Sequence, residues 1–430
     1  MILRDPVHGL VSFESEEERI IELLIDTPEV QRLRRIRQLG VTSFAFPGAE
    51  HTRFSHAVGA TFVMKLLLSR LRQIELELPT SQRITTQCVQ DALAAALLHD
   101  VGHGPLSHLF EDAIEGGVRH ETWTERIVSD PSTGVHAVLA SYDPKMPSRV
   151  VDLVHGRHPL PFLAKAVSGA FDVDRCDYLL RDAYATGVRY GNYDLDWLLR
   201  SLRFAPTSAG VAPSLAIDGA KGLPAIEAFM LARLFMFQQV YLHKATRSAE
   251  WMIRTILGYA ARLVAQGDAL PGLPSAINCA ALGKEVPLVD YLELDDNVLW
   301  GMLHAWEAHS DRALADLCAR VRRRALFKTI ELFGEWASEE GRQKGYALAC
   351  EVARARGFDA NLYVGLDLAT VTPFTDEDDE PLMVVYQKGP ARPLYEVSFL
   401  LGRLRDQLLT RARLVVAPEI REEVMRALGL

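Results

Sequence analysis

Two adjacent residues, His99 and Asp100, carry side chains that suit a divalent metal ion. They close an apolar run and precede a turn with the sequence Val-Gly-His-Gly-Pro. An imidazole nitrogen and a carboxylate oxygen are both common ligands of divalent metals. A lone His-Asp pair occurs by chance in many chains, but here His56 lies upstream and Asp174 downstream. We therefore predict a mixed nitrogen and oxygen site that leaves positions on an octahedral ion open for water and phosphate oxygens.

A second group of polar residues follows the first. His103 and His108 come shortly after the His-Asp pair, and Glu111 and His120 lie further along. Imidazoles beside a metal-bound water are candidates for proton transfer near neutral pH. A single histidine is more often a hydrogen-bonded core residue, but six of the thirteen histidines fall within residues 51–120. This clustering favours a site.

The elements that would position these residues are mostly helical. The apolar spacing predicts helices over 55–75 and 86–100, and the second is apolar almost all round, as a central helix is. Further helices are predicted over 174–186 and, as one long element, over 223–266. A stretch rich in Pro, Ser and Gly at 203–217, with strand-like flanks, predicts a β-hairpin.

The character of the sequence changes towards the C-terminus. Alternating or β-branched residues predict strands over 361–368, 382–386 and 412–417. We therefore predict a mainly α protein, with a helical domain at 1–325 and a smaller α+β region at 326–430.

Composition narrows the classes of function. The chain has 430 residues, of which 49% are hydrophobic, enough for a large core. It has no run of about 18 uncharged apolar residues and no signal-peptide pattern, so we expect no membrane span. The five cysteines lack CxxC spacing and are expected to be reduced thiols in a cytoplasmic protein. A net charge of −9 argues against bulk nucleic-acid binding, while a local basic pocket would still accept an anionic substrate.

Several motifs together resemble the HD-domain phosphohydrolases, and among them the deoxynucleoside triphosphate triphosphohydrolases that include the SAM-and-HD-domain enzymes. The motifs are Asp5-Pro-Val-His-Gly9, Phe46-Pro-Gly-Ala-Glu-His-Thr-Arg-Phe-Ser-His56, Leu98-His-Asp-Val-Gly-His-Gly-Pro-Leu-Ser-His108, Asp172-Val-Asp-Arg-Cys-Asp-Tyr178 and Tyr241-Leu-His-Lys244. The resemblance covers residues 1–260, and the remainder matches loosely. It implies an HD-domain helical core with no SAM domain before it.

The resemblance assigns roles to both groups of polar residues. The family's metal ligands fall on the first group: His56, His99, Asp100 and Asp174. Its catalytic residues for proton transfer fall on the second group: His103 and His108, supported by Glu111 and His120. The ligand set implies one divalent ion and leaves its identity open among Mn, Fe, Mg, Ni, Co and Zn.

The resemblance also implies the substrate contacts. They fall on Gln38, Leu39, Arg53, Arg175, Tyr178, Asp182, Arg233 and Tyr241. In the family the Gln meets the 3′-hydroxyl of the sugar and the Leu excludes a 2′-hydroxyl. The cations bind phosphates, and a Tyr and an Asp lie beside the sugar. A Gln-Leu pair before Gly40 is also what a helix C-cap produces, so both interpretations of that pair stay open.

Two further comparisons bear on specificity and regulation. Phe237 and Leu242 stand where the SAM-and-HD enzymes have polar residues, so base preference stays open. The nucleotide-regulated members of the family use an Asp, a Gln and an Arg that match Asp26, Gln31 and Arg34. This match implies an allosteric site for an activating nucleotide.

The resemblance thus implies a metal-dependent dNTP triphosphohydrolase, a homo-oligomer, that cleaves dNTP to deoxynucleoside and triphosphate. The expected oligomer is a dimer or a tetramer, and nucleic acid is not expected as a partner. One alternative is an HD phosphohydrolase of another nucleotide, such as a monophosphate or an alarmone. The other is a nucleotide-sensing regulatory protein with vestigial catalysis, which the presence of His103 and His108 argues against.

Overall fold

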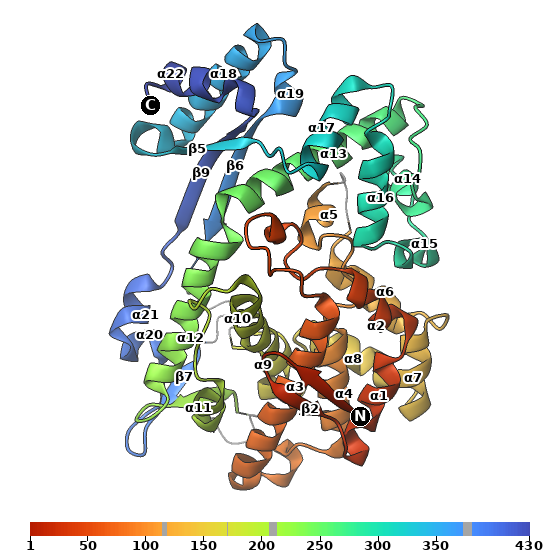
Figure 1. Cartoon of the computed structure of the whole chain (residues 1–430). Coiled ribbons are helices and arrows are strands. Elements are labelled where there is room, and N and C mark those ends of the chain that lie inside the picture. The colour runs from red at the N-terminus through yellow and green to blue at the C-terminus, as the bar shows by residue number, and fades with distance from the viewer. Residues whose placement is uncertain (114–117, 170, 206–212, 373–380) are drawn as a thin grey trace.

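The computed structural model describes residues 1–113, 118–169, 171–205, 213–372 and 381–430, with their side chains except those of Glu77, His108, Asp112 and Ala113. The described residues are mainly helical, which confirms the predicted fold class. Figure 1 shows a large helical body that includes the N-terminus, and a smaller group of strands and helices that includes the C-terminus.

Three helices form the middle of the larger body: α3 (Arg53–Ile74), α4 (Thr86–Leu98) and α10 (Val173–Thr186). α3 packs against both of the others. α4 begins where the Thr85 side chain accepts a hydrogen bond from the amide of Cys88, and residues 91–98 are all buried. α10 begins where the Asp172 side chain accepts from the amide of Arg175. All three helices were predicted.

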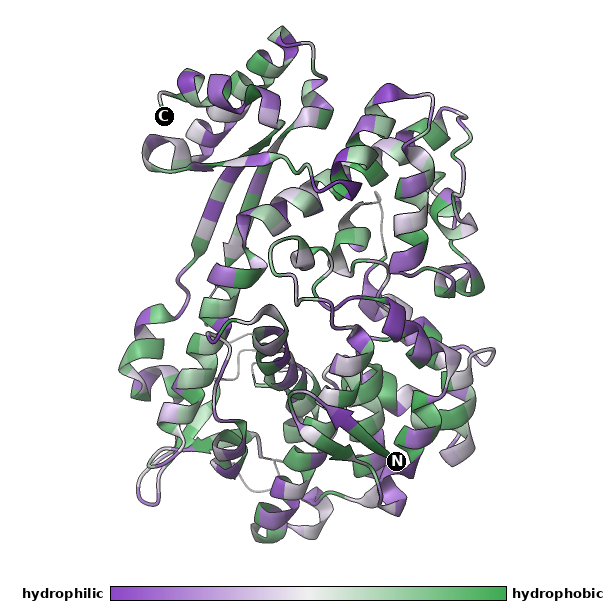
Figure 2. Cartoon of the chain, in the orientation of Figure 1, coloured by the Kyte–Doolittle hydropathy of each residue, from purple (hydrophilic) through white to green (hydrophobic). Residues whose placement is uncertain are grey.

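Shorter helices surround this middle layer. They are α1 (Arg19–Ile25), α2 (Pro28–Arg32), α5 (His108–Ala113), α6 (His120–Ser129), α7 (Gly134–Tyr142), α8 (Met146–Val154), α9 (Pro161–Val167) and α11 (Leu195–Arg200). α8 packs against α4 on one side and α6 on another. In Figure 2 hydrophobic and hydrophilic residues alternate along most helices, as expected when one face of each is buried.

The long helix predicted over 223–266 is interrupted. α12 (Leu223–Met236) ends in a π-helical turn at Phe237–Tyr241, and α13 (Lys244–Ala265) then begins at a cap formed by His243. The prediction of one continuous helix was therefore wrong over 237–243. Single π-helical turns are frequent at functional sites, and this one carries two residues of the pocket described below.

α13 connects the larger body to a second core. Its buried side chains, such as Met252 and Ile256, pack with those of the following helices and of the C-terminal sheet. These helices are α14 (Ser275–Ala281), α15 (Leu288–Leu292), α16 (Asp296–Trp306) and α17 (Arg312–Arg322). α13 therefore touches both parts of the molecule.

The C-terminal sheet has the order β5 (Lys328–Leu332), β9 (Leu409–Val416), β6 (Val364–Val371), and both pairings are antiparallel. α18 (Glu339–Ala355) and α22 (Arg421–Leu428) pack together against it. The strand predicted over 361–368 starts later, because Asp359 caps a short helix, α19 (Ala360–Tyr363). β5 was not predicted.

The remaining strands lie in the larger body. β1 (Ile2–Asp5) and β2 (Gly9–Ser12) form a hairpin, and β3 (Leu202–Phe204) and β4 (Leu215–Asp218) form the hairpin predicted at 203–217. β7 (Met383–Val385) pairs in parallel with β4, and β8 (Arg392–Pro393) pairs with β7. Together with α20 (Leu394–Val397) and α21 (Phe399–Leu404), this segment contributes Val384, Leu394 and Leu401 to the first core. The predicted boundary at 325 stays a prediction.

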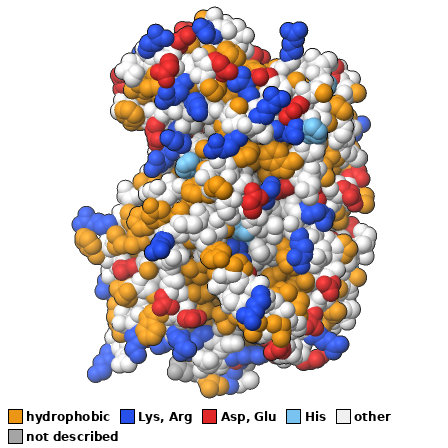
Figure 3. Space-filling view, in the orientation of Figure 1, with side chains coloured by type: hydrophobic (Ala, Val, Ile, Leu, Met, Phe, Trp, Pro, Cys, Tyr) orange, Lys and Arg blue, Asp and Glu red, His pale blue; other side chains and the backbone are white. Residues whose placement is uncertain are grey.

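The surface and the cysteines agree with the composition. Figure 3 shows acidic and basic side chains mixed over the visible face. Among the described helices, none combines the length and the apolar character that crossing a membrane requires. The five cysteines are free thiols.

Candidate active site

Three of the four predicted metal ligands, His56, His99 and Asp174, bring their donor atoms into one cluster, and Asp100 lies beside it in a second group with His103 and His120. His56 lies in the first turn of α3, His99 and Asp100 follow the end of α4, and Asp174 lies in the first turn of α10. The Nε2 atom of His56 is 2.9 Å from an oxygen of Asp174, 3.3 Å from Nε2 of His99 and 3.7 Å from an oxygen of Asp100. The Nε2 atom of His99 is 3.5 Å from an oxygen of each aspartate.

The orientation of both imidazoles suits a cation. Nδ1 of His99 lies 2.9 Å from the carbonyl oxygen of Ala96, which only accepts, so this nitrogen carries the hydrogen and Nε2 carries the lone pair. Nδ1 of His56 lies 2.8 Å from a carboxylate oxygen of Asp177 in the same way. With both hydrogens on Nδ1, the two Nε2 lone pairs face each other, and a divalent cation between them would stabilise the arrangement. The residues present therefore fit a divalent metal.

Asp177 is fully buried, and the sequence analysis did not single it out. Its carboxylate accepts two hydrogen bonds of 2.8 Å from Arg181 and lies 2.7 Å from Nε2 of His8. Burial lowers the pKa of His56, but Asp174 and Asp177 outweigh this and raise it to about 10. Without a cation the Nε2 atom of His56 would therefore carry a proton at neutral pH, and a divalent ion, favoured by the same negative charge, would take the place of that proton. The i,i+4 spacing of Asp177 and Arg181 was a signal that could have found the pair.

Next to this cluster, His103 and His120 stack with 3.8 Å between their ring centroids. Nε2 of His103 is 3.3 Å from an oxygen of Asp100, and its Nδ1 is 3.3 Å from Oε1 of Glu111. The same Glu111 oxygen is 3.1 Å from Nδ1 of His120. Burial and the charge of Arg53 lower the pKa of His103 to about 3, so its imidazole is neutral at pH 7.

The loop that carries His103 is held by close contacts. A Cβ atom on Gly102 would lie 2.2 Å from the carbonyl oxygen of His120, so glycine lets α6 bring that histidine close. Leu106 and Ser107 both have left-handed backbones, with φ of 53° and 61°, which costs about 1 kcal/mol or more each. The amide of Leu106 donates to Asp296 at 2.8 Å, which offsets part of this strain.

Arg53 places a positive charge at the same end of the site. Its side chain is buried, forms an ion pair with Asp100, and donates from Nε to the hydroxyl of Ser107 at 2.8 Å. Burial raises the pKa of Asp100, but Arg53 and His99 outweigh this and hold it well below its usual range. Asp100 is therefore ionised and available to a cation at neutral pH.

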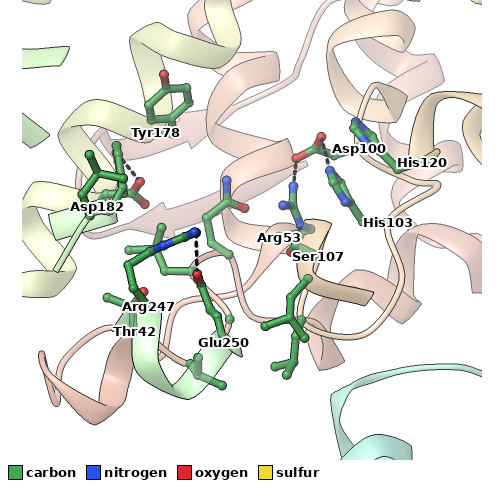
Figure 4. A pocket seen from close by; sticks show the side chains of 18 of the residues that line it. Thr42, Arg53, Asp100, His103, Ser107, His120, Tyr178, Asp182, Arg247 and Glu250 are labelled. Carbon is green, nitrogen blue, oxygen red and sulfur yellow. Dashed lines mark hydrogen bonds and ion pairs between the residues drawn. The ribbon is translucent and has the colours of Figure 1, made fainter. Parts of the chain in front are cut away.

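Of these groups, Arg53, Asp100, His103, His120 and Asp174 line one end of a pocket of about 570 Å³, part of which is drawn in Figure 4. Residues from the sequence analysis that line it are Gln38, Leu39, Arg53, Asp100, His103, His120, Asp174, Tyr178, Asp182, Phe237, Tyr241 and Leu242. Asp182 is fixed by the hydroxyl of Tyr241 and by Nε2 of His51, each at 2.7 Å. Oε1 of Gln38 is buried and has no hydrogen-bond partner among the described residues, so it is available to a ligand.

Three other predicted residues are placed differently. Arg175 and Arg233 are not among the described residues that line this pocket. Arg175 donates to the carbonyl of Gly169 and lies 3.1 Å from Asp172. The side chain of His108 lies outside the described part of the chain. The roles of these residues in phosphate binding and proton transfer stay predictions.

Three charged residues of α13 also line the pocket and were not singled out from the sequence: Arg247, Glu250 and Arg254. Nη1 of Arg247 donates to Oε2 of Glu250 at 3.0 Å, and its Nε donates at 3.1 Å to Asp367 of β6. Burial raises the pKa of Glu250, and the charges of Arg247 and Arg254 oppose the rise. Their spacing along one helix face is visible in the sequence, but a charged helix face is usually solvated.

The residues matched to an allosteric site lie near each other at the surface. Nε of Arg34 donates to Oε1 of Gln31 at 2.8 Å, and the Gln31 amide donates to the carbonyl of Ile25 at 2.8 Å. Asp26 follows α1 and is exposed. A nucleotide site at this place stays a prediction.

Known proteins resemble the chain in sequence. A family model for the HD domain matches residues 53–182. The uncharacterized protein YwfO of Bacillus subtilis is 31% identical over 445 residues, which span 100% of this chain and 97% of YwfO. Deoxynucleoside triphosphate triphosphohydrolase SAMHD1 of Gallus gallus is 27% identical over 83% of this chain and 60% of its own length. The human protein of that name is 33% identical over 47% of this chain and 36% of its own length.

Solved structures resemble the whole fold. A phosphohydrolase from Bacteroides thetaiotaomicron superposes with a TM-score of 0.79 at 29% identity, covering 97% of this chain and 99% of that one. A hypothetical protein from Aquifex aeolicus has a TM-score of 0.74 at 25% identity, covering 100% of this chain and 99% of that one. The likeness therefore extends beyond the segment matched by the family model.

Proposed function

The chain belongs to the HD-domain family, and we propose that it is a metal-dependent phosphohydrolase that cleaves deoxynucleoside triphosphates to deoxynucleoside and triphosphate. The observation that carries the proposal is the cluster of His56, His99 and Asp174 with Asp100 beside it, of which Asp100 and Asp174 line the pocket. The family supports hydrolysis of a phosphate compound. The choice of dNTP and of the bond cleaved is supported by similarity to the SAMHD1 triphosphohydrolases.

The residues of the chain would divide the chemistry as follows. A divalent ion held by the four ligands would polarise a phosphate oxygen and make a water molecule more acidic. Arg53, buried at the same end, would balance part of the phosphate charge. The neutral ring of His103 would accept a proton from the attacking water, and His103 or His108 would deliver a proton to the 5′-oxygen, which leaves as the hydroxyl of the deoxynucleoside. Glu111, 3.3 Å from the other nitrogen of that ring, would stabilise its protonated form.

The sugar would lie further along the pocket. The unpaired Oε1 of Gln38 is an acceptor for the 3′-hydroxyl. Leu39 lines the same pocket and would leave no space for a 2′-hydroxyl. Tyr178 and Asp182 lie four residues apart on α10 and would face the sugar. This arrangement supports a deoxyribonucleotide as substrate.

Product analysis tests the proposal. The protein is loaded with Mn²⁺ and incubated with each dNTP and each NTP, separately and in equimolar mixtures, and the products are resolved by chromatography. We expect deoxynucleoside and triphosphate from dNTPs and much slower turnover of NTPs. The same preparation of Asp174→Ala should be inactive, which shows that the activity belongs to this site.

Other outcomes would identify the alternatives. Release of pyrophosphate or of monophosphate from dNTPs would contradict cleavage at the α-phosphorus. Hydrolysis of a nucleoside monophosphate or an alarmone, with no turnover of dNTPs, would point to another HD phosphohydrolase. Tight nucleotide binding without any product would point to a sensor.

A further inference from the structure

The wall of the pocket that α13 forms carries charged side chains of both signs. Arg247, Glu250 and Arg254 succeed one another at intervals of three and four residues, so they share one face of the helix. Figure 4 shows Arg247 and Glu250 on one side of the view and Asp100, His103 and Arg53 on the other. This wall is therefore separate from the metal end of the pocket.

The C-terminal sheet fixes this wall. Asp367 on β6 is 4% exposed and forms an ion pair with Arg247, with Nε of the arginine 3.1 Å from one of its oxygens. Nη1 of Arg247 then donates to Oε2 of Glu250 at 3.0 Å. A planar guanidinium held on two sides leaves little freedom to the carboxylate it contacts. The orientation of Glu250 is thus set from a strand 120 residues away in the sequence.

The net charge of this wall indicates what it would bind. Two guanidinium groups, from Arg247 and Arg254, lie with two carboxylates, from Glu250 and Asp367, so formal charges cancel. A neutral wall gives no net attraction to a triphosphate, which the metal end would hold. It does present hydrogen-bonding groups of both kinds to an uncharged polar ligand. A nucleotide whose phosphates lie at the metal end would bring its base to a wall of this type.

We propose that Glu250 is a specificity-determining residue that accepts hydrogen bonds from a guanine base, with Asp367 and Arg247 as its positioning residues. The inference rests on the proposed function, since it assigns the base end of that same pocket. A carboxylate has two acceptor oxygens side by side. Among the DNA bases only guanine presents two adjacent N–H donors, on N1 and N2. Arg254 carries a guanidinium, the group that commonly donates hydrogen bonds to O6 and N7 of guanine.

A competition assay tests the proposal. The metal-loaded protein receives dGTP, dATP, dCTP, dTTP and dITP at equal concentrations in one tube, so that any activating nucleotide acts on all of them alike. The ratios of consumption then give the ratios of kcat/KM. We expect dGTP to exceed dITP, which lacks the N2 amino group, by about tenfold, the usual effect of losing one hydrogen bond to a charged group. dATP, which lacks both donors, should fall further behind.

Variants separate the specific role from a structural one. Glu250→Gln replaces one acceptor by a donor, so it should lower the ratio of dGTP consumption to dTTP consumption by about tenfold. Asp367 lies outside the pocket, and Asp367→Asn should lower the ratio of dGTP consumption to dTTP consumption by a smaller factor. Glu285→Gln, at a side chain that is 80% exposed, is the matched control and should leave every ratio unchanged.

The results that overturn the inference differ from those that overturn the proposed function. Equal consumption of all five nucleotides by the wild type, or an equal slowing of all five by Glu250→Gln, would remove the guanine assignment and leave the dNTPase intact. If no dNTP is consumed, the proposed function fails, and calorimetric titration with dGTP, dITP and dATP decides the inference. Equal Kd values for the three, or values that Glu250→Gln shifts alike, would then overturn it.

Discussion

At the scale of the residue, the site depends on which nitrogen of each histidine carries the hydrogen. The carbonyl of Ala96 and the carboxylate of Asp177 each engage an Nδ1 atom, and this turns both Nε2 lone pairs towards the same point. The types and order of the candidate metal ligands were readable in the sequence because they lie in short motifs. The partners that orient them were not, because Ala96 contributes only a backbone oxygen and Asp177 acts from another helix.

The first prediction concerns the metal. Removing one ligand leaves three donors, and losing an aspartate also removes a negative charge. We expect His99→Ala, Asp100→Ala and Asp174→Ala each to lose bound metal and nearly all activity while staying folded. Elemental analysis after dialysis and circular dichroism measure the two properties. Asp152→Asn, an exposed carboxylate on α8, is the control. Full metal occupancy in all three variants would contradict the assignment.

The second prediction concerns His103 and pH. Its pKa is lowered to about 3, so the ring takes up a proton only when the pH falls towards that value, and it is neutral at any higher pH. His103→Ala should lower kcat by about a hundredfold or more. The factor should be the same throughout roughly pH 5 to pH 9, with KM and metal content preserved. If the acid limb of the pH profile of kcat were shifted in His103→Ala relative to the wild type, His103 would titrate in that range, and this prediction would be contradicted.

The third prediction concerns the sugar. If Leu39 occupies the space beside C2′, Leu39→Gly should admit ATP, whereas the wild type should prefer dATP. If Gln38 binds the 3′-hydroxyl, Gln38→Ala should raise KM or lower kcat on dATP by about tenfold, which corresponds to one hydrogen bond of roughly 1–2 kcal/mol. Equal rates on dATP and ATP in the wild type would contradict both the steric role and the choice of deoxyribonucleotides.

At the scale of the element, the site is made where α3, α4 and α10 meet. Their helical periodicity and caps are local properties, which is why the sequence predicted all three. The interruption at 237–243 was not predictable, because no Pro or Gly marks it. Instead the chain turns where Leu242 packs against Ala369 and Val371 of β6, and where Arg413 of β9 donates to the Leu242 carbonyl at 2.8 Å.

The fourth prediction tests how closely α3 and α10 must approach. A Cβ atom at Gly59 would lie 2.0 Å from Asp177 and 2.2 Å from Arg181. Gly59→Ala should therefore displace this buried pair and destabilise the protein by roughly 3 kcal/mol or more. Gly301→Ala on α16 meets nothing within 4 Å and should stabilise by up to about 1 kcal/mol, as Ala does in an exposed helix. Urea denaturation of the two variants measures the contrast; equal stabilities would contradict the close contact.

At the scale of the whole molecule, the C-terminal part supports the pocket through the contact of Asp367 with Arg247, although the described lining residues all come from earlier in the chain. The strands at its end were predicted from their own alternation, which is a local pattern. Their partners were not, since β7 pairs with a strand more than 150 residues earlier and Asp367 pairs with Arg247, 120 residues earlier on α13. Such pairings depend on tertiary packing and leave no periodic pattern in the amino-acid sequence. The α13 wall of the pocket was missed for the same reason.

The last prediction concerns assembly. Large hydrophobic side chains on the described surface include Phe399, Val289 and Leu408, which are 80%, 69% and 66% exposed. Contact between identical copies would cover surfaces of this kind, and most homo-oligomers close with two-fold symmetry. We therefore expect light scattering to give twice 47.9 kDa or more, with a further increase if dNTPs bind near Asp26 and Arg34. Arg34→Ala should remove the response to dNTPs and leave the mass without nucleotide unchanged, because this arginine lies at the surface, where its Nε donates to Gln31. A mass of one chain, with and without dNTPs, would contradict the oligomer.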